Sequence, residues 1–100
     1  MIGEREARAE LRKVIDPELG INIVDLGLVY RLETRGPRIE VDFTLTYPGC
    51  PVGPQLRKEI VETLSRAAAG AEVEANIVWE PLWGPERMSE EARLSLGYPI

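Results

Sequence analysis

Cys50 is the only cysteine of the chain, and it lies in the stretch TYPGCPVGP, which runs from Thr46 to Pro54. This stretch follows an expected strand and precedes an expected helix. Unpaired N–H groups at a helix N-terminus stabilise an anion and lower the pKa of a nearby thiol, so the position suits a reactive or metal-binding thiolate. An isolated cysteine is more often a small buried apolar residue. The residue pattern alone leaves both interpretations open.

Three acids, Asp16, Glu18 and Asp25, lie within ten residues of one another in the segment DPELGINIVD. The strand after this segment is expected to pair in a hairpin with the strand that precedes Cys50, so it starts at the end of the sheet where the thiol lies. Carboxylates there could be metal ligands or bases, and their charge would raise the thiol pKa. Asp16 and Asp25 could instead cap turns by accepting hydrogen bonds from backbone N–H groups. Thr46, which opens the cysteine stretch, completes the candidate site.

Three helices are expected around these residues. Apolar residues at helical spacing predict the first over residues 4–15, where Pro17 disfavours helix in the residue before it. The second is expected over residues 54–69, between an N-terminal proline and Gly70. A short C-terminal helix has Ser89 as its N-cap, and Trp83 is expected to pack back over the body of the protein.

Alternating apolar and polar residues predict strands over residues 28–33, 39–47 and 73–80. The turn TRGPR joins the first two strands as an antiparallel hairpin, and a helical crossover makes the third strand parallel to the second. Because each strand has one polar face, only one face of the sheet is covered by helices. We therefore expect an α+β two-layer sandwich with the order α-β-β-α-β and a mixed three-stranded sheet. The uncovered face should carry Arg31, Glu40, Asp42, Thr44, Thr46, Glu74 and Asn76.

Composition limits the class of protein. The length of 100 residues predicts one domain over residues 1–100. The net charge of −5 argues against nucleic-acid binding. No apolar stretch approaches the ~20 residues that span a bilayer, and the charged N-terminus lacks an apolar signal core. A single cysteine forms no internal disulfide, so we expect a cytoplasmic protein.

The absence of histidine limits the chemistry further. One cysteine without histidine cannot supply the roughly four protein ligands of an iron–sulfur cluster, nor those of a structural zinc site. A Cys–His catalytic pair is impossible, and the chain has no CxxC, GxGxxG or Walker motif. An ordinary hydrolase is therefore disfavoured, and we expect a protein that is not an enzyme. Any iron or cluster bound at Cys50 would be shared with a partner, a second chain or a small thiol.

Three segments, VIDPELGINIVDLGLVYRL, VDFTLTYPGCPVG and VWEPLWGPERMSEEAR, together resemble the SufT/PaaD-like family of iron–sulfur cluster assembly and maturation proteins. The resemblance runs from about Val14 to Leu96. It implies an iron–sulfur assembly type of α/β fold and a cytosolic role in maturing or delivering clusters. It also implies that Cys50 is the characteristic cysteine of the family, and that Asp16, Glu18 and Asp25 are its DPE-type and DLG-type acids.

Three functions follow as hypotheses. The first is an accessory factor in iron–sulfur cluster maturation, with Cys50 as a transient ligand or persulfide-type acceptor and no permanently bound cofactor. Its partners would be the assembly machinery or client apoproteins, and a homodimer formed through the bare sheet face could bring two Cys50 sites together. The second is an adaptor for a multicomponent phenylacetyl-CoA oxygenase, in which Cys50 is structural. The third is a stand-alone thiol enzyme.

Overall fold

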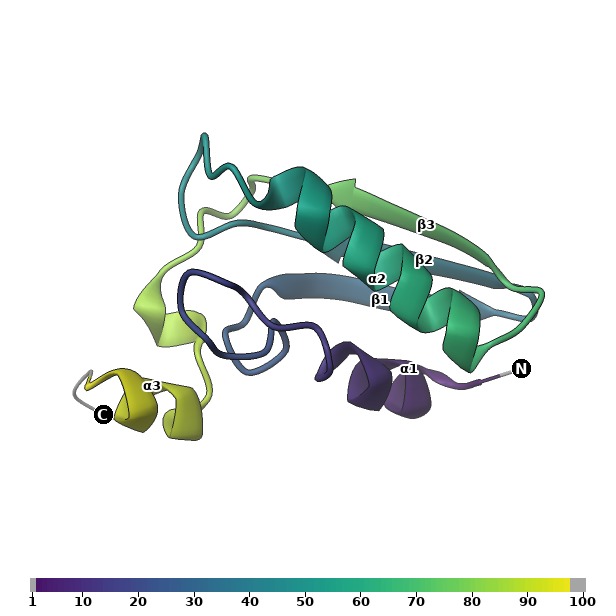
Figure 1. The fold of residues 1–100 in the computed structure, drawn as a ribbon, viewed down its shortest axis with the longest axis horizontal. Helices are drawn as coiled ribbons and strands as arrows, with labels where there is room; N and C mark the ends of the chain where they lie inside the picture. Colours follow the sequence, from purple (N-terminus) through teal and green to yellow (C-terminus); the bar gives the residue numbers. More distant parts are fainter. Residues whose placement is uncertain (1, 98–100) are drawn as a thin grey trace.

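A computed structural model describes residues 2–97 and confirms the predicted α+β class (Figure 1). The order of elements along the chain is helix, two strands, helix, strand, a single 3₁₀ turn and a short helix. Their bounds are α1 Glu4–Leu11, β1 Val29–Arg35, β2 Arg38–Phe43, α2 Gly53–Ala67, β3 Glu72–Ile77, η1 Pro85–Arg87 and α3 Glu90–Leu96.

The sheet is mixed, as the sequence predicts. Its strand order is β1-β2-β3, with β1 antiparallel and β3 parallel to the central strand β2. The start of β1 and the ends of β2 and β3 therefore meet at one end of the sheet, where Val29 and Ile77 both pair with Phe43. The candidate site residues lie in the loops that leave or enter this end.

The core lies between one face of the sheet and the helices α1 and α2, which lie on the same side (Figure 1). Inward residues of β2 alternate with polar outward ones, and Ile39, Val41 and Phe43 are buried. Leu56, Ile60 and Leu64 from α2 are buried with them. The two-layer prediction is therefore confirmed. No helix within residues 2–97 has the length and apolar character that crossing a membrane requires.

The first helix is shorter than its periodicity predicts. It ends at Leu11, and the chain turns at Arg12. The residues that follow pair with the next turn of the chain instead, because Ile23 N–H donates to the Val14 carbonyl and Ile15 forms an isolated bridge with Asn22. Ile15 is consequently exposed, which corrects its predicted place on the buried helix face.

The second and third strands end earlier than the alternation predicts, whereas β1 continues to Arg35. β2 stops at Phe43, after which Thr44 and Leu45 are both buried, so Thr44 does not lie on an exposed polar face. Tyr47, predicted on the apolar face, is exposed, and so is Trp79 because β3 stops at Ile77. The physical reason is that loops fold over this end of the sheet, and a strand's period of two no longer decides which side chains are covered.

The start of β1 contains an irregularity that the sequence does not reveal. Val29 pairs with Phe43 and Arg31 with Asp42, which leaves Tyr30 as an extra residue at a bulge. The Tyr30 hydroxyl donates to the Pro81 carbonyl at 2.8 Å. This bond ties the segment after β3 to the beginning of β1.

The C-terminal predictions are confirmed. Ser89 caps α3, with its hydroxyl oxygen accepting a hydrogen bond from Ala92 N–H at 3.1 Å. Trp83 packs against the core, and its indole N–H donates to the Leu26 carbonyl at 2.7 Å. The segment after β3 is therefore held to the loop that carries the acids.

Candidate functional site

Cys50 lies in the loop between β2 and α2, where its side chain is only 7% exposed. Its backbone N–H donates to the Tyr47 carbonyl at 3.3 Å, which closes a turn around Pro48 and Gly49. Gly49 has a φ of +86°, a backbone conformation that residues with a side chain rarely adopt. The turn therefore holds the thiol just ahead of the first residues of α2.

Glu18 is the acid that contacts the thiol. Cys50 Sγ donates to Glu18 Oε1 at 3.3 Å, and the Tyr47 hydroxyl donates to Glu18 Oε2 at 3.2 Å. One carboxylate thus accepts two hydrogen bonds from side chains of the cysteine loop. The sequence places Glu18 and Cys50 at the same end of the sheet, and the structure brings them into direct contact.

Asp16 stabilises the turn that carries Glu18. Its side chain is 1% exposed, and Oδ1 accepts hydrogen bonds from the backbone N–H groups of Glu18 at 2.8 Å and Leu19 at 3.2 Å. This is the turn-capping role that the sequence allows as an alternative to metal ligation. Asp16 fixes the turn, and the turn presents Glu18 to the thiol.

Asp25 faces a different set of residues. Its carboxylate accepts a hydrogen bond from the Asn22 side-chain amide at 2.8 Å and lies 3.8 Å from the Arg12 guanidinium. Its backbone N–H donates to Asn22 Oδ1 at 2.9 Å, so Asn22 rather than Asp25 caps this turn. Thr46, the remaining candidate, is half-buried in the loop that leads to Cys50.

The surroundings of Cys50 raise the pKa of its thiol above the ordinary value. Burial is the largest cause, and the hydrogen bond to Glu18 and the charges of Glu18 and Asp16 act in the same direction. The backbone of Val52, at the start of α2, lowers the pKa but does not outweigh them. Cys50 is therefore held as a protonated thiol at neutral pH.

Tyr47 is the contact residue that sequence reasoning missed. Its place in an apparent alternation suggested an apolar strand residue, whereas its hydroxyl bonds the same carboxylate as the thiol. Partial burial and then the charge of Glu18 raise the pKa of the Tyr47 hydroxyl. The signal available in the sequence was its position between Thr46 and Pro48, in a stretch too rich in proline and glycine to continue a strand.

The donor set at this site is one sulfur and one carboxylate. Within residues 2–97, no group of three or more Cys, Asp or Glu side chains is placed to hold a metal ion. A metal bound by Cys50 and Glu18 would thus have open positions for ligands from elsewhere. Such a pair is suited to transient binding rather than to permanent storage.

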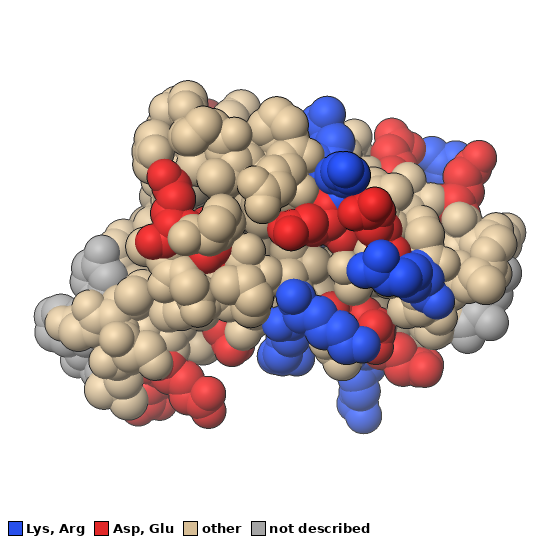
Figure 2. Space-filling view, viewed as in Figure 1, with Lys and Arg blue, Asp and Glu red and all other residues tan. Residues whose placement is uncertain are grey.

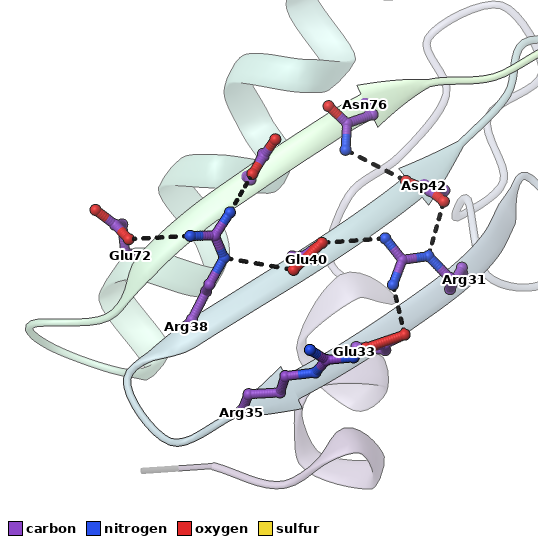
Figure 3. Close-up of polar contacts among 9 residues, drawn as sticks. Arg31, Glu33, Arg35, Arg38, Glu40, Asp42, Glu72 and Asn76 are labelled. Carbon is purple, nitrogen blue, oxygen red and sulfur yellow. Dashed lines mark hydrogen bonds and ion pairs between the residues drawn. The ribbon is translucent and has the colours of Figure 1, made fainter.

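The uncovered face of the sheet is a second polar region, and it is largely self-neutralised (Figure 3). Arg31 donates to Glu33 at 2.6 Å, to Asp42 at 2.8 Å and to Glu40 at 3.2 Å. These bonds lower the pKa of Asp42 and of Glu33, with Arg31 as the largest cause in both. Arg38 in turn bonds Glu74 at 2.7 Å. This face carries no contact to Cys50 among the interactions of the described residues.

The residues of this site lie within a region that matches a known protein family. The model of the family described as iron-sulfur cluster assembly protein matches residues 4–77. The matched region contains Asp16, Glu18, Asp25 and Cys50. It ends before the segment that carries Trp83 and α3.

The chain is also similar to individual bacterial proteins. It is 46% identical to the Fe-S protein maturation auxiliary factor SufT of Staphylococcus aureus, over 84% of this chain and 97% of that protein. It is 39% identical to the Fe-S protein maturation auxiliary factor YitW of Bacillus subtilis, over 87% and 86% of the two chains. The crystal structure of a domain of unknown function, DUF59, from Bacillus anthracis superimposes with a TM-score of 0.90 at 40% identity, covering 96% of this chain and 92% of that one.

Proposed function

We propose that this chain, which belongs to the family of iron–sulfur cluster assembly proteins, is an auxiliary factor in the maturation of iron–sulfur proteins. In this role Cys50 binds iron or a cluster transiently as cargo. Glu18 accepts the thiol proton and then serves as a second ligand. The similarity to the S. aureus and B. subtilis maturation factors over most of each chain supports the general role. The contact between Cys50 Sγ and Glu18 Oε1, at 3.3 Å, is the observation that supports the site.

The chemistry at Cys50 begins from a protonated thiol. The thiolate is the form that binds metal, so the S–H bond must break as the S–Fe bond forms. The proton can pass to the Glu18 carboxylate, which already accepts the thiol hydrogen bond. Cys–SH and Fe²⁺ give Cys–S–Fe⁺ and H⁺, with a total charge of +2 on both sides. Glu18 then releases the proton to water, because its side chain is exposed, and the carboxylate is free to bind the metal.

Weak retention of the cargo follows from the small number of donors. Cys50 and Glu18 supply at most two protein ligands, whereas clusters usually need about four. The remaining ligands would come from an assembly protein, a client apoprotein or a small thiol. A partner that offers more thiolates would then withdraw the cargo, which favours delivery over storage.

Anaerobic titration of the protein with Fe²⁺, alone and with sulfide, tests this function. The wild type should develop sulfur-to-iron charge-transfer absorption, Cys50→Ser should not, and Glu18→Gln should bind iron more weakly. The matched control is Glu91→Gln, which removes an acid from an exposed position in α3 and should behave as the wild type. Circular dichroism of each variant shows that it is folded.

Activation of a [4Fe–4S] client apoenzyme provides the decisive arm. If Cys50→Ser activates the client as fast as the wild type does, Cys50 is not a ligand in delivery. The adaptor hypothesis, in which the protein only brings other components together, would then replace the proposed chemistry. Slower activation by Cys50→Ser with unchanged binding to the client would support the ligand role.

A further inference from the structure

Most of the net charge of this protein is concentrated at the end of the molecule that holds Cys50. We define the Cys50 end as residues 14–27, 44–53 and 78–89. It contains five acids and one base, a net charge of −4 out of −5 for the whole chain. The acids are Asp16, Glu18, Asp25, Glu80 and Glu86, and the base is Arg87.

The charges elsewhere nearly cancel. The rest of the chain holds twelve acids and eleven bases, a net charge of −1. In the view of Figure 2, Lys and Arg gather over α1 and α2, and acids are the only charged side chains seen at the opposite end. Arg12 reaches toward Asp25 at 3.8 Å from just outside the Cys50 end, which still leaves that end clearly acidic.

Exposed apolar side chains are concentrated in the same three segments. Tyr47 is 46% exposed, Trp79 37% and Leu82 66%, and Ile15 is exposed as well. Only Leu94, among the large apolar side chains found exposed in the described residues, lies outside the Cys50 end. Aromatic residues that are exposed beside a polar rim are typical of protein-binding surfaces.

Hydrogen bonds hold the three segments together at one end of the molecule. Tyr47 and Cys50 bond Glu18, which connects the cysteine loop to the acid loop. The indole of Trp83 bonds the Leu26 carbonyl, which connects the acid loop to the segment after β3. The exposed aromatic ring of Tyr47 and the thiol of Cys50 therefore share one carboxylate partner.

We propose that the Cys50 end is a docking surface for a partner protein that presents a basic segment with an apolar or aromatic anchor. The inference rests on the proposed function, because it describes the partner that would approach the Cys50–Glu18 pair. Positive charge on the partner would complement the charge of −4, and its apolar anchor would cover Tyr47, Trp79 and Leu82.

The charge of this surface argues against the other occupants. A second copy of the chain docked through the same end would oppose −4 with −4, and like charges at an interface cost free energy. Nucleic acids and anionic membrane surfaces are repelled for the same reason. A basic protein segment with an apolar anchor would complement both the negative charge and the exposed apolar side chains of the Cys50 end.

Two synthetic peptides of equal length test the proposal. Both carry the same Leu-Phe anchor and no cysteine, one flanked by lysines and the other by glutamates. The peptides are titrated into ¹⁵N-labelled protein, and amide chemical shifts are followed at low and physiological salt. We expect the lysine peptide to shift the amide resonances of Tyr47, Trp79 and Leu82 and to bind at least about tenfold more tightly than the glutamate peptide. Its affinity should fall as salt screens the charges.

Matched variants separate charge from apolar contact. Glu80→Gln with Glu86→Gln should weaken binding of the lysine peptide about threefold to tenfold, and Trp79→Ser with Leu82→Ser should abolish it. Glu90→Gln with Glu91→Gln removes the same charge from α3, and Leu94→Ser removes an exposed apolar residue outside the Cys50 end. These two controls should bind the peptide as the wild type does.

Equal binding of both peptides, no binding of either, or equal weakening by the control variants would overturn the proposal. The same titration with Cys50→Ser distinguishes this result from failure of the proposed function. Peptide binding by Cys50→Ser without iron binding would support the docking surface and separate it from the thiol chemistry. Iron binding by the wild type without peptide binding would overturn the docking surface and leave the proposed function in place.

Discussion

The Cys50 thiol donates a hydrogen bond to the Glu18 carboxylate, with 3.3 Å between Sγ and Oε1. A carboxylate next to a buried thiol stabilises the protonated form, because a thiolate there would be both desolvated and repelled. The helix that follows does not compensate for this effect. Cys50 is thus held as a thiol rather than as the more reactive thiolate.

Glu18→Gln should make Cys50 more reactive. The substitution keeps the shape of the side chain but removes its negative charge, so the pKa of the Cys50 thiol should fall toward its ordinary value without reaching it, because burial remains. Rates of alkylation by iodoacetamide as a function of pH measure this pKa. Glu91→Gln is the control, and an identical pH profile for Glu18→Gln and the wild type would contradict the role given to Glu18.

Stability should fall in alkaline solution, and Cys50 should account for the first part of the fall. The folded protein raises the thiol pKa above 9.0, so as pH rises past about 9 the unfolded chain loses its thiol proton before the folded chain does. The free energy of unfolding therefore decreases with pH in this range. Urea unfolding from pH 8 to 10 should show a shallower decrease for Cys50→Ser, and a slope equal to that of the wild type would refute the assignment. Above about pH 10 the Tyr47 hydroxyl, whose pKa is also raised, adds to the loss.

Gly27→Ala should destabilise the protein more than Gly20→Ala does. Both glycines have positive φ, +76° and +71°, so alanine costs about 1–2 kcal/mol of conformational strain at either position. A Cβ at Gly27 would also overlap the Arg87 carbonyl oxygen, whereas a Cβ at Gly20 meets nothing within 4 Å. We expect a loss of about 3 kcal/mol or more for Gly27→Ala by urea unfolding. Equal losses at the two positions would mean that the approach of residues 27 and 87 is not close in solution.

Arg31→Met should destabilise the protein at neutral pH and less so in acid. Arg31 lowers the pKa of Asp42 below 3.8, so its stabilising effect is present above that pH and is lost as pH falls through the folded-state pKa. The difference between wild type and variant should therefore stay nearly constant from pH 7 to about pH 5 and narrow as the pH falls below about 4. Arg35→Met, which removes an exposed arginine paired with Glu33 alone among these acids, should have the smaller effect. A difference that stays constant with pH would show that Arg31 acts through packing.

Much of the fold is predictable because it depends on local periodicity. Alternation along β2 identifies Ile39, Val41 and Phe43 as inward residues, and helical spacing identifies Leu56, Ile60 and Leu64. The hairpin and the crossover then give the strand order. The ends of the elements were less predictable, because they depend on bonds outside the elements: the Val14 carbonyl accepts from Ile23 N–H, and Thr44 N–H donates to the Leu28 carbonyl.

The candidate site was predictable in position but not in its contacts. Topology alone places the acids and Cys50 at one end of the sheet. Which acid reaches the thiol depends on a turn in which Asp16 accepts two backbone hydrogen bonds and Glu18 contacts the thiol. No periodic pattern distinguishes the two acids, because the segment that carries them is neither helix nor strand.

By itself, the sequence determined the class of fold, the end of the sheet at which the thiol lies, and the limit of one thiol and no imidazole for any chemistry. Only the tertiary structure decided the state of that thiol, through its burial and its bond to Glu18 from a loop 32 residues away. The physical reason is that periodicity reports which side of an element faces the core. A pKa and a docking surface depend instead on which loops meet in space.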